Sequence, residues 1–337
     1  MADTSTIARG GGSSPAPARG RRGSAPPRKP SGLPAWVVPY VLLLPGLVVI
    51  GGLLLYPLYQ MVAMSFQNVG LRQIRGVPAE SVGLENYEKL LESELFWTSL
   101  RNTVVFAVVT VALTLILGTV VGILLHNLSG KMSTFLIVGI MAAWATPAIA
   151  SAIIWRWMFD AESGIINWAL NALPDWFSEL LFGRADWTGE PWLNDPFTIY
   201  LVLILVVVWA GFPFIAVSIL AGLKSISAEL YEAARVDGAS AWRTFWKITV
   251  PLLKPVFSVL IVLSTIWNFK VFTQLFVLAG GTSNREAFNL SLFSFTQAFS
   301  APPKMGMGAA IAVVLTLILL VITAVYVRQI VKTEDVR

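Results

Sequence analysis

The sequence predicts an all-α membrane protein with six transmembrane helices. Hydrophobic residues make up 56% of its 337 residues and charged residues only 13%, a balance too apolar for a soluble domain of this length. Six apolar segments are each long enough to cross a hydrocarbon core, which takes about 20 helical residues. The Lys and Arg residues are divided unevenly between the polar segments, which predicts a single orientation in the membrane.

The N-terminal segment, residues 1–34, is rich in Gly, Ser, Pro, Ala and Arg. It has almost no large apolar side chains, so it cannot bury enough surface to fold and is predicted to be a disordered, basic cytoplasmic tail. The tail can anchor the topology or touch anionic lipid headgroups. We do not expect a cleaved signal, because the apolar run that follows is too long.

Residues 35–337 are predicted to form the membrane domain. Pro45, Pro57, Pro147 and Pro213 lie within or at the ends of its apolar segments. They predict kinks, because proline removes a helix hydrogen bond that neighbouring helices or water must replace. The expected spans are residues 36–60, 102–125, 134–157, 197–222, 256–279 and 307–327.

Both termini are predicted to lie in the cytoplasm. This arrangement places 15 of the 24 Lys and Arg residues on the cytoplasmic side, eight outside and one, Lys270, within a span. An excess of positive charge inside is the usual rule for multi-pass membrane proteins. Residues 223–254 then form a cytoplasmic loop. Residues 158–196 are external, and their amphipathic run, Ile165–Leu181, predicts a helix at the outer interface.

The cytoplasmic loop contains a polar stretch, Glu232–Pro251, between two long apolar runs. Asp237-Gly238 predicts the end of a short helix, because Gly readily takes the left-handed conformation after a helix. Ser240 is a candidate N-cap for a second helix that starts at Ala241. The local prediction is a short helix, a tight turn and another short helix.

The spacing within this stretch resembles the EAA loop of permease subunits in bacterial ABC importers. The resemblance implies that the loop forms a coupling helix, which docks on a cytoplasmic ATPase subunit through residues 232–239. Val250 departs from the pattern, because Leu is more usual there. The alternative is an amphipathic interfacial loop without a partner. The matching positions are Glu232, Ala233, Ala234, Asp237, Gly238, Ala239, Ile248 and Pro251.

A candidate substrate site lies on the fifth expected span. Ser264, Trp267, Asn268 and Val271 have the spacing of one helix face. An aromatic ring can stack on a sugar while Ser and Asn bond its hydroxyls; hydrogen bonds between helices are the alternative. Resemblance to maltose-type permeases implies that these positions contact sugar, although Val271 replaces a polar residue of that pattern. It adds Ala210, Gly211 and Phe214 from the preceding span.

Lys270 and Gln274 are expected to form an i,i+4 pair on a flank of the same face. An ionisable residue within a span usually faces a cavity or a partner. A long Lys side chain can instead extend to the outer interface. Both interpretations of Lys270, pathway lining and snorkelling, remain open from the sequence.

The family resemblance covers residues 36–332. Two external stretches, residues 276–299 and 83–103, resemble those of carbohydrate-uptake permeases, and residues 144–147, 164–168 and 326–329 look most like actinobacterial permeases for chitobiose-type or other oligosaccharides. The resemblance implies the type I ABC importer permease fold in a bacterial cytoplasmic membrane. It also implies a second permease subunit, two ATPase subunits and an extracytoplasmic sugar-binding lipoprotein as partners.

Several other functions are disfavoured by the composition. The sequence has no Walker P-loop, so ATP and Mg²⁺ are expected on the partner ATPase and no cofactor on this chain. It has no Cys and a single His, His126, which leaves no metal cluster and no obvious catalytic set. Basic and aromatic residues do not alternate in a way that would suggest nucleic-acid binding. An ion-coupled secondary transporter needs carboxylates within the membrane, and none lies in the six expected spans.

Overall fold

The computed structural model describes residue 34 and residues 36–334, so nearly all of the predicted tail lies outside the described residues. The chain divides into two units, residues 1–55 and 56–337, which are considered separately. The first unit contains α1 (Val38–Ile50), with Pro45 inside it, and a π-helical turn, η1 (Gly51–Leu55). All residues of α1 are exposed within this chain, as expected for a helix that faces lipid or a partner.

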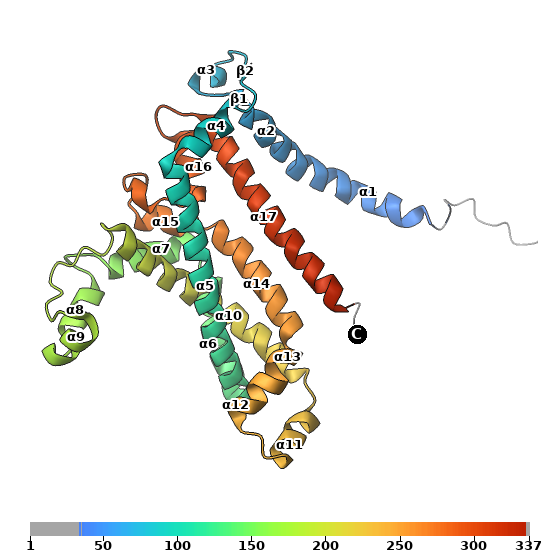
Figure 1. The fold of residues 1–337 in the computed structure, drawn as a ribbon, viewed down its shortest axis with the longest axis vertical. Coiled ribbons are helices and arrows are strands. Elements are labelled where there is room, and N and C mark those ends of the chain that lie inside the picture. The colour runs from blue at the N-terminus through green and yellow to red at the C-terminus, as the bar shows by residue number, and fades with distance from the viewer. Residues whose placement is uncertain (1–33, 35, 335–337) are drawn as a thin grey trace, which may run out of the picture. The chain divides into compact units, whose positions relative to one another are not determined.

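The second unit is built from long helices, with a short β-hairpin at one end (Figure 1). The small elements at that end are β1 (Gln67–Asn68), α3 (Leu71–Ile74), β2 (Glu80–Ser81) and α4 (Glu85–Glu92). The longer helices are α2 (Tyr56–Ser65), α5 (Glu94–Asn127), α6 (Gly130–Ala145), α7 (Ala148–Met158), α10 (Pro196–Lys224), α14 (Lys254–Phe269) and α17 (Met305–Glu334).

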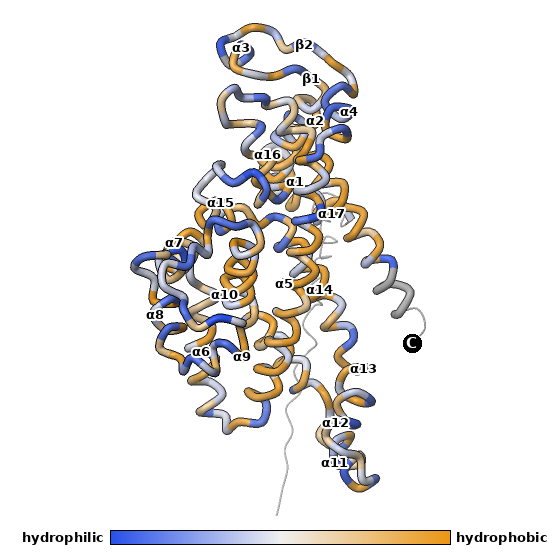
Figure 2. Tube along the Cα trace, turned by 60° about the vertical axis from the view of Figure 1, so that its left-hand side comes forward, coloured by the Kyte–Doolittle hydropathy of each residue, from blue (hydrophilic) through white to orange (hydrophobic). Residues whose placement is uncertain are grey.

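The number of apolar helical stretches agrees with the sequence-based prediction. In the described residues, five stretches could cross a membrane by length and composition, and six if the bent pair α6–α7 counts as one span. Figure 2 shows these helices as mostly hydrophobic, with hydrophilic residues gathered in the connections. The five stretches are Val38–Ser65, Glu94–Asn127, Pro196–Lys224, Lys254–Leu278 and Met305–Arg328.

Close packing of α5 against α10 forms the centre of the second unit. A Cβ atom on Gly118 would lie 2.6 Å from Cβ of Ile215 and 3.1 Å from the carbonyl oxygen of Phe212. One on Gly122 would lie 2.9 Å from the carbonyl oxygen of Ala216. Small residues at these two positions therefore allow the two backbones to approach closely, as is usual for helix pairs in membranes.

Gly118→Ala should lower the unfolding temperature of the solubilised protein. The new methyl group must displace Ile215, whose branched side chain is stiff, and such overpacking costs about 1–3 kcal/mol. Gly139→Ala is the matched control, because a Cβ there meets nothing within 4 Å. Thermal unfolding of both variants in one detergent measures the difference, and equal unfolding temperatures would contradict this account of the contact.

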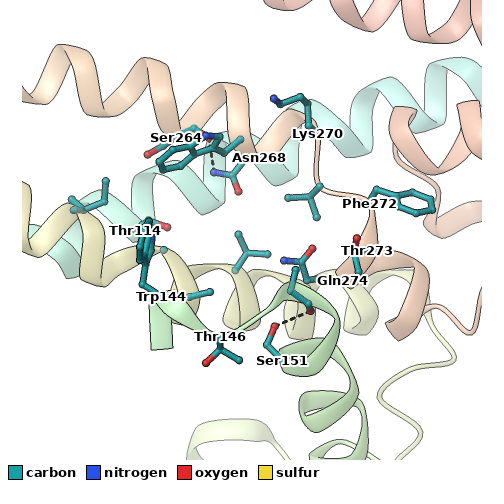
Figure 3. A pocket seen from close by; sticks show the side chains of 17 residues that line it. Thr114, Trp144, Thr146, Ser151, Ser264, Asn268, Lys270, Phe272, Thr273 and Gln274 are labelled. Carbon is teal, nitrogen blue, oxygen red and sulfur yellow. Dashed lines mark hydrogen bonds between the residues drawn. The ribbon is translucent and has the colours of Figure 1, made fainter. Parts of the chain in front are cut away.

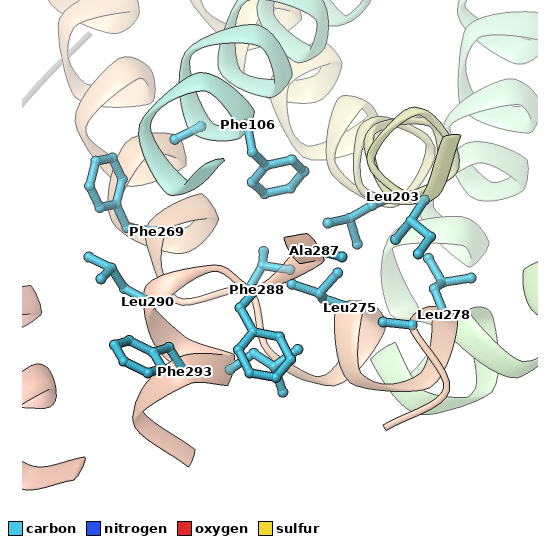
Figure 4. Packing of buried hydrophobic residues seen from close by; sticks show 14 of the residues in the cluster. Phe106, Leu203, Phe269, Leu275, Leu278, Ala287, Phe288, Leu290 and Phe293 are labelled. Atoms are coloured by element: carbon cyan, nitrogen blue, oxygen red, sulfur yellow. The ribbon is translucent and has the colours of Figure 1, made fainter. Parts of the chain in front are cut away.

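The largest apolar core of the second unit lies where this helix pair meets α14 and the residues that follow it (Figure 4). Phe106 of α5 and Leu203 of α10 meet Phe269 at the end of α14 and Leu275 of α15 (Thr273–Leu278). A helix that the sequence did not predict, α16 (Leu290–Phe299), adds Leu290 and Phe293 to this core, after a 3-10 turn, η3 (Arg285–Ala287). The segment after the fifth span therefore folds back onto the bundle.

The third expected span, residues 134–157, is not one continuous helix. The chain bends by 91° between α6 and α7, at Thr146-Pro147. Proline disfavours the helical conformation at the residue before it, and Thr146 is extended, with ψ 127°. The kink predicted from Pro147 is thus a sharp break, and α7 packs against α15.

The fifth expected span, residues 256–279, is also broken, without any Pro or Gly at the break. Helix α14 ends at Phe269, and α15 begins at Thr273. Asn289 Nδ2 donates to the carbonyl oxygen of Val271 at 2.6 Å, and Ser291 Oγ donates to that of Phe269 at 3.3 Å. These bonds satisfy carbonyl groups at the break, which would otherwise be costly to bury.

The external segment between α7 and α10 also differs from its prediction. The run Ile165–Leu181 forms two short helices, α8 (Ile165–Asn171) and α9 (Asp175–Phe182), because Pro174 separates them. The segment has an aromatic core, in which the rings of Trp187 and Trp192 stack at 5.5 Å. It is therefore a folded unit rather than a single interfacial helix.

Candidate functional site

A cavity of about 350 Å³ lies where the two broken spans meet α5 and α10. One wall comes from α14 and the residues that follow it, and the opposite wall from the α6–α7 break. In Figure 3, Ser264 and Asn268 lie on one side and Trp144, Thr146 and Ser151 on the other. The breaks matter because they bring side chains and helix ends, rather than a continuous apolar face, to the cavity.

Most of the residues predicted for the substrate pathway line this cavity. Phe214 does not line it, but its ring packs beside the cavity, 6.1 Å from Trp144 and 5.4 Å from Trp267. Trp267 is 46% exposed in this chain, so part of its ring is available for contact. The predicted residues that line the cavity are Ala210, Gly211, Ser264, Trp267, Asn268, Lys270, Val271 and Gln274.

The expected single face of the fifth span needs a correction. Ser264, Trp267 and Asn268 share α14, but Val271 lies beyond its end, in the break. Lys270 and Gln274 do not form an i,i+4 helical pair, because the break separates them. In the view of Figure 3 the Lys270 side chain extends away from Asn268, Thr273 and Gln274, and it is exposed in this chain.

Asn268 carries an unused hydrogen-bond acceptor at the cavity. It is only 5% exposed, and its Nδ2 donates to the carbonyl oxygen of Ser264 at 2.8 Å. Its Oδ1 is buried and has no partner in the described part of the chain. A buried polar atom of this kind usually has a partner, and leaving it without one costs about 1–3 kcal/mol. Among the described residues Asn268 makes no hydrogen bond to another helix, which is the contact that the interhelical alternative requires.

The hydroxyl groups around the cavity also present acceptors. Thr114 Oγ1 donates to the carbonyl oxygen of Thr110 at 2.7 Å, and Thr146 Oγ1 to that of Ala142 at 2.9 Å. Ser151 Oγ donates within α7 as well. Because each hydroxyl proton is held by its own helix, the oxygen lone pairs remain for a ligand. Among the described residues no Asp or Glu lines this cavity, and Lys270 does, so the site suits a ligand that is rich in hydroxyl or amide donors and carries no positive charge.

About half of the residues that line the cavity were not predicted from the sequence. Residues 144–147 contribute to the family resemblance, and a Trp and a polar residue beside Pro147 also indicate a functional break in a span. Thr114 gave no signal, because a single Thr in a long apolar run is common. The cavity-lining residues that were not predicted include Thr114, Trp144, Thr146, Ser151, Phe272 and Thr273.

The predicted coupling turn has the geometry of a Schellman motif. Helix α11 (Ala228–Val236) ends before Gly238, whose φ is +72°. The N–H of Ala239 donates to the carbonyl oxygen of Ala234 at 2.9 Å, and that of Gly238 to the carbonyl oxygen of Arg235 at 3.1 Å. The predicted helix end and the Ser240 N-cap are both confirmed, since Ser240 Oγ accepts from the N–H of Arg243.

The side chains of the turn divide into exposed and buried ones. Glu232, Ala233 and Asp237 are exposed, whereas Ala234 is only 6% exposed and packs within this chain. A small side chain at position 234 is therefore needed for packing within this chain, and not only for the close approach of a partner. The Tyr231 hydroxyl lies 3.2 Å from Thr249 Oγ1, which ties α11 to the chain that leads into α14.

A second cavity, of about 290 Å³, lies at the external ends of α7 and α15. Arg156 Nη1 donates to the carbonyl oxygen of Val277 at 3.0 Å and joins these two ends. Asp160 also lines this cavity, and the backbone N–H and hydroxyl of Ser163 hold the pKa of its carboxyl below the ordinary value. Asp160 therefore stays ionised, and the external cavity, unlike the inner one, carries charges of both signs.

These features define a multi-pass membrane transport subunit, in which broken spans enclose a polar and aromatic cavity and a structured loop follows the fourth span. The chain belongs to the family of binding-protein-dependent transport system inner membrane components, which matches residues 118–332. The family resemblance noted in the sequence is thereby confirmed.

Two relatives and one solved structure illustrate the similarity. The diacetylchitobiose uptake system permease protein DasB of Streptomyces coelicolor is 36% identical over 299 residues, 89% of this chain and 88% of that protein. The trehalose/maltose transport system permease protein MalF of Thermococcus litoralis is 33% identical over 291 residues, 86% of this chain and 92% of that protein. A chain of a bacterial ABC transporter that imports the acidic polysaccharide alginate has the same fold, with a TM-score of 0.72 at 19% identity over 88% of this chain and 96% of that one.

Proposed function

We propose that this chain is one of two permease subunits of an ATP-driven importer for oligosaccharides, with both termini in the cytoplasm. The observation that carries the proposal is the inner cavity, which Asn268 lines with a buried Oδ1 that has no partner among the described residues. A sugar hydroxyl or an acetamido N–H would satisfy this acceptor, and Trp267 would stack on the ring. The substrates named for the relatives, diacetylchitobiose, trehalose and maltose, carry such groups.

The coupling part of the proposal rests on the loop between α10 and α14. Glu232 and Asp237 are exposed and lie outside the two ion pairs of the described residues, which makes them available to cations on an ATPase. The Tyr231–Thr249 contact links α11 to the residues that lead into α14, and α14 carries Trp267 and Asn268. Movement of the ATPase would therefore reach the cavity through a short, continuous path of packed elements.

The proposed complex has four kinds of component besides lipid. This chain supplies half of the pathway, and a second permease supplies the other half. Two ATPase subunits bind ATP and Mg²⁺ in the cytoplasm, and an extracytoplasmic binding protein delivers the sugar. This chain is assigned no ATPase site and no cofactor, in keeping with the missing P-loop in its sequence.

Reconstituted transport tests the proposal. Vesicles are prepared with this chain, the second permease subunit and the ATPase. ATP is enclosed on the side of the membrane that carries the ATPase, and sugar-loaded binding protein is added on the other side. We expect accumulation of an oligosaccharide from a panel of diacetylchitobiose, trehalose and maltose, and none when ATP, the binding protein or this chain is omitted. Uptake that continues without ATP would overturn the proposal.

An ion-coupled secondary transporter is the second candidate, and the two broken spans are the observation that favours it. The inner cavity has no carboxylate to bind Na⁺ or a proton, and the described residues contain no group of three or more metal-ligating side chains. The same vesicles separate the candidates, because an imposed ion gradient without ATP should drive uptake only through the second kind of transporter.

A further inference from the structure

The second half of the cytoplasmic loop carries an exposed aromatic cluster that the coupling turn does not use. Trp242, in α12 (Ala241–Thr244), is 72% exposed, and Trp246, in the π-helical turn η2 (Phe245–Thr249), is 51% exposed. The two indole rings meet edge to face at 5.6 Å, and Phe245 lies 5.1 Å from Trp246. The three rings form one apolar surface, called here the aromatic cluster.

The charged residues of the second half of the loop are all basic, and the acidic ones lie on α11 and its turn. Arg243, Lys247 and Lys254 are all exposed, and the sequence contains no Asp or Glu between Gly238 and Glu286. The two ion pairs of the described residues lie elsewhere, at Lys89–Glu85 and Arg184–Glu190. The surface therefore combines large aromatic rings with unneutralised cations.

The position of the aromatic cluster along the chain is close to a membrane span. Turn η2 continues through α13 (Val250–Leu252) into α14, which begins at Lys254 and is part of a spanning stretch. Figures 1 and 2 both show α12 nearer to α14 than α11 is. Trp beside Lys and Arg at the end of a span is typical of the membrane–water interface, where indole rings sit among the headgroups.

We propose that the aromatic cluster, with Arg243, Lys247 and Lys254, binds anionic phospholipid headgroups of the cytoplasmic leaflet. The loop then has two separate contacts: α11 and its turn face the ATPase, while α12 and η2 lie on lipid. Anionic headgroups complement the cations, and each Lys or Arg near such a surface raises binding about fivefold. This proposal depends on the proposed function for two points only, namely that the loop lies on the cytoplasmic side and that α11 contacts the ATPase.

Site-specific labels can read the two contacts separately, because this chain has no Cys. Trp246→Cys places one fluorescent label in the aromatic cluster. Val236→Cys places the matched control on α11, where Val236 is 88% exposed. The assembled transporter, with cysteine-free partner subunits, is reconstituted in phosphatidylcholine vesicles with and without phosphatidylglycerol. A nitroxide on the lipid headgroup and an aqueous quencher are then applied in turn, before and after removal of the ATPase.

We expect the lipid nitroxide to quench the label at position 246, more strongly with phosphatidylglycerol, and the ATPase to leave this label unaffected. The ATPase should shield the label at position 236 from the aqueous quencher, and lipid should not reach it. Arg243→Gln with Lys247→Gln should remove most of the phosphatidylglycerol effect at position 246. Ala241→Cys gives the same readout without removing a ring, if Trp246→Cys does not assemble.

Two results would overturn the lipid site: shielding of positions 241 and 246 by the ATPase, or free access of the aqueous quencher to both in every lipid mixture. The quenching is read without ATP or sugar. Absence of the expected quenching would therefore refute the lipid contact alone. A failure of sugar transport would leave the lipid contact intact and refute only the proposed function.

Discussion

Gly238→Val should abolish the sugar-stimulated ATP hydrolysis of the assembled transporter while the spanning helices still insert. Gly238 has a φ of +72°, a conformation that a β-branched residue adopts at a cost of about 1–2 kcal/mol. The Schellman bonds of Gly238 and Ala239 would break to relieve this strain, so α11 would lose its fixed end. Because α11 is expected to seat in the ATPase, the displaced turn should uncouple or release that subunit.

The purified complex in lipid tests this expectation, through ATP hydrolysis with and without sugar-loaded binding protein and through co-purification of the ATPase. Gly130→Val is the matched control: Gly130 begins α6, has no left-handed φ, and a Cβ there meets nothing within 4 Å. It should keep full stimulation. If Gly238→Val and Glu232→Lys both retain full stimulation and full ATPase binding, the turn is not the coupling element.

Asn268→Ala should reduce oligosaccharide uptake several-fold without preventing assembly. The variant removes the buried acceptor Oδ1, and one hydrogen bond to a ligand contributes roughly 0.5–1.5 kcal/mol, or about twofold to tenfold. Trp267→Ala should have a larger effect, because it removes the stacking face and also the edge-to-face contact with Phe214. The initial rate of uptake over a range of sugar-loaded binding protein concentrations measures both.

Two further variants separate substrate contact from helix packing. Thr265→Val is the control for Asn268→Ala, because Thr265 is also on α14, bonds only to its own helix and does not line the cavity. Trp267→Phe keeps a ring against Phe214. Compared with Trp267→Ala, it should assemble normally but restore only part of the uptake. Normal uptake by Asn268→Ala and Trp267→Ala at normal expression would show that α14 does not contact the substrate.

Local sequence determined the coupling turn. Gly238 follows a helical stretch and Ser240 precedes the next one, so the Schellman end and the N-cap depend on residues within a few positions of each other. The apolar spans were predictable for a similar reason, since length and composition alone satisfy the requirements of the bilayer. Burial of Ala234 was not predictable, because it depends on what the rest of the chain places beside that side chain.

The periodicity of the sequence predicted the part of the candidate site that α14 carries, and the family resemblance added Ala210 and Gly211 of α10. Ser264, Trp267 and Asn268 occupy one face of α14, and helical spacing brings them together. Trp144 and Ser151 reach the same cavity from α6 and α7, more than 100 residues earlier in the chain. No local sequence pattern predicts that these side chains lie close together, because their proximity follows from how the helices pack.

The two breaks in the spans show what the sequence by itself could indicate and what only the tertiary structure decided. Pro147 marks its break in the sequence, since its ring disfavours the helical conformation at Thr146, although Pro45 and Pro213 lie inside α1 and α10 without ending them. Residues 270–272 contain nothing that prevents a helix, yet α14 ends at Phe269. That break exists because Asn289 and Ser291, from a segment folded back across the bundle, donate to the carbonyl groups of Val271 and Phe269. In an apolar environment a helix can open only where such donors replace its own hydrogen bonds, and their arrival depends on the fold.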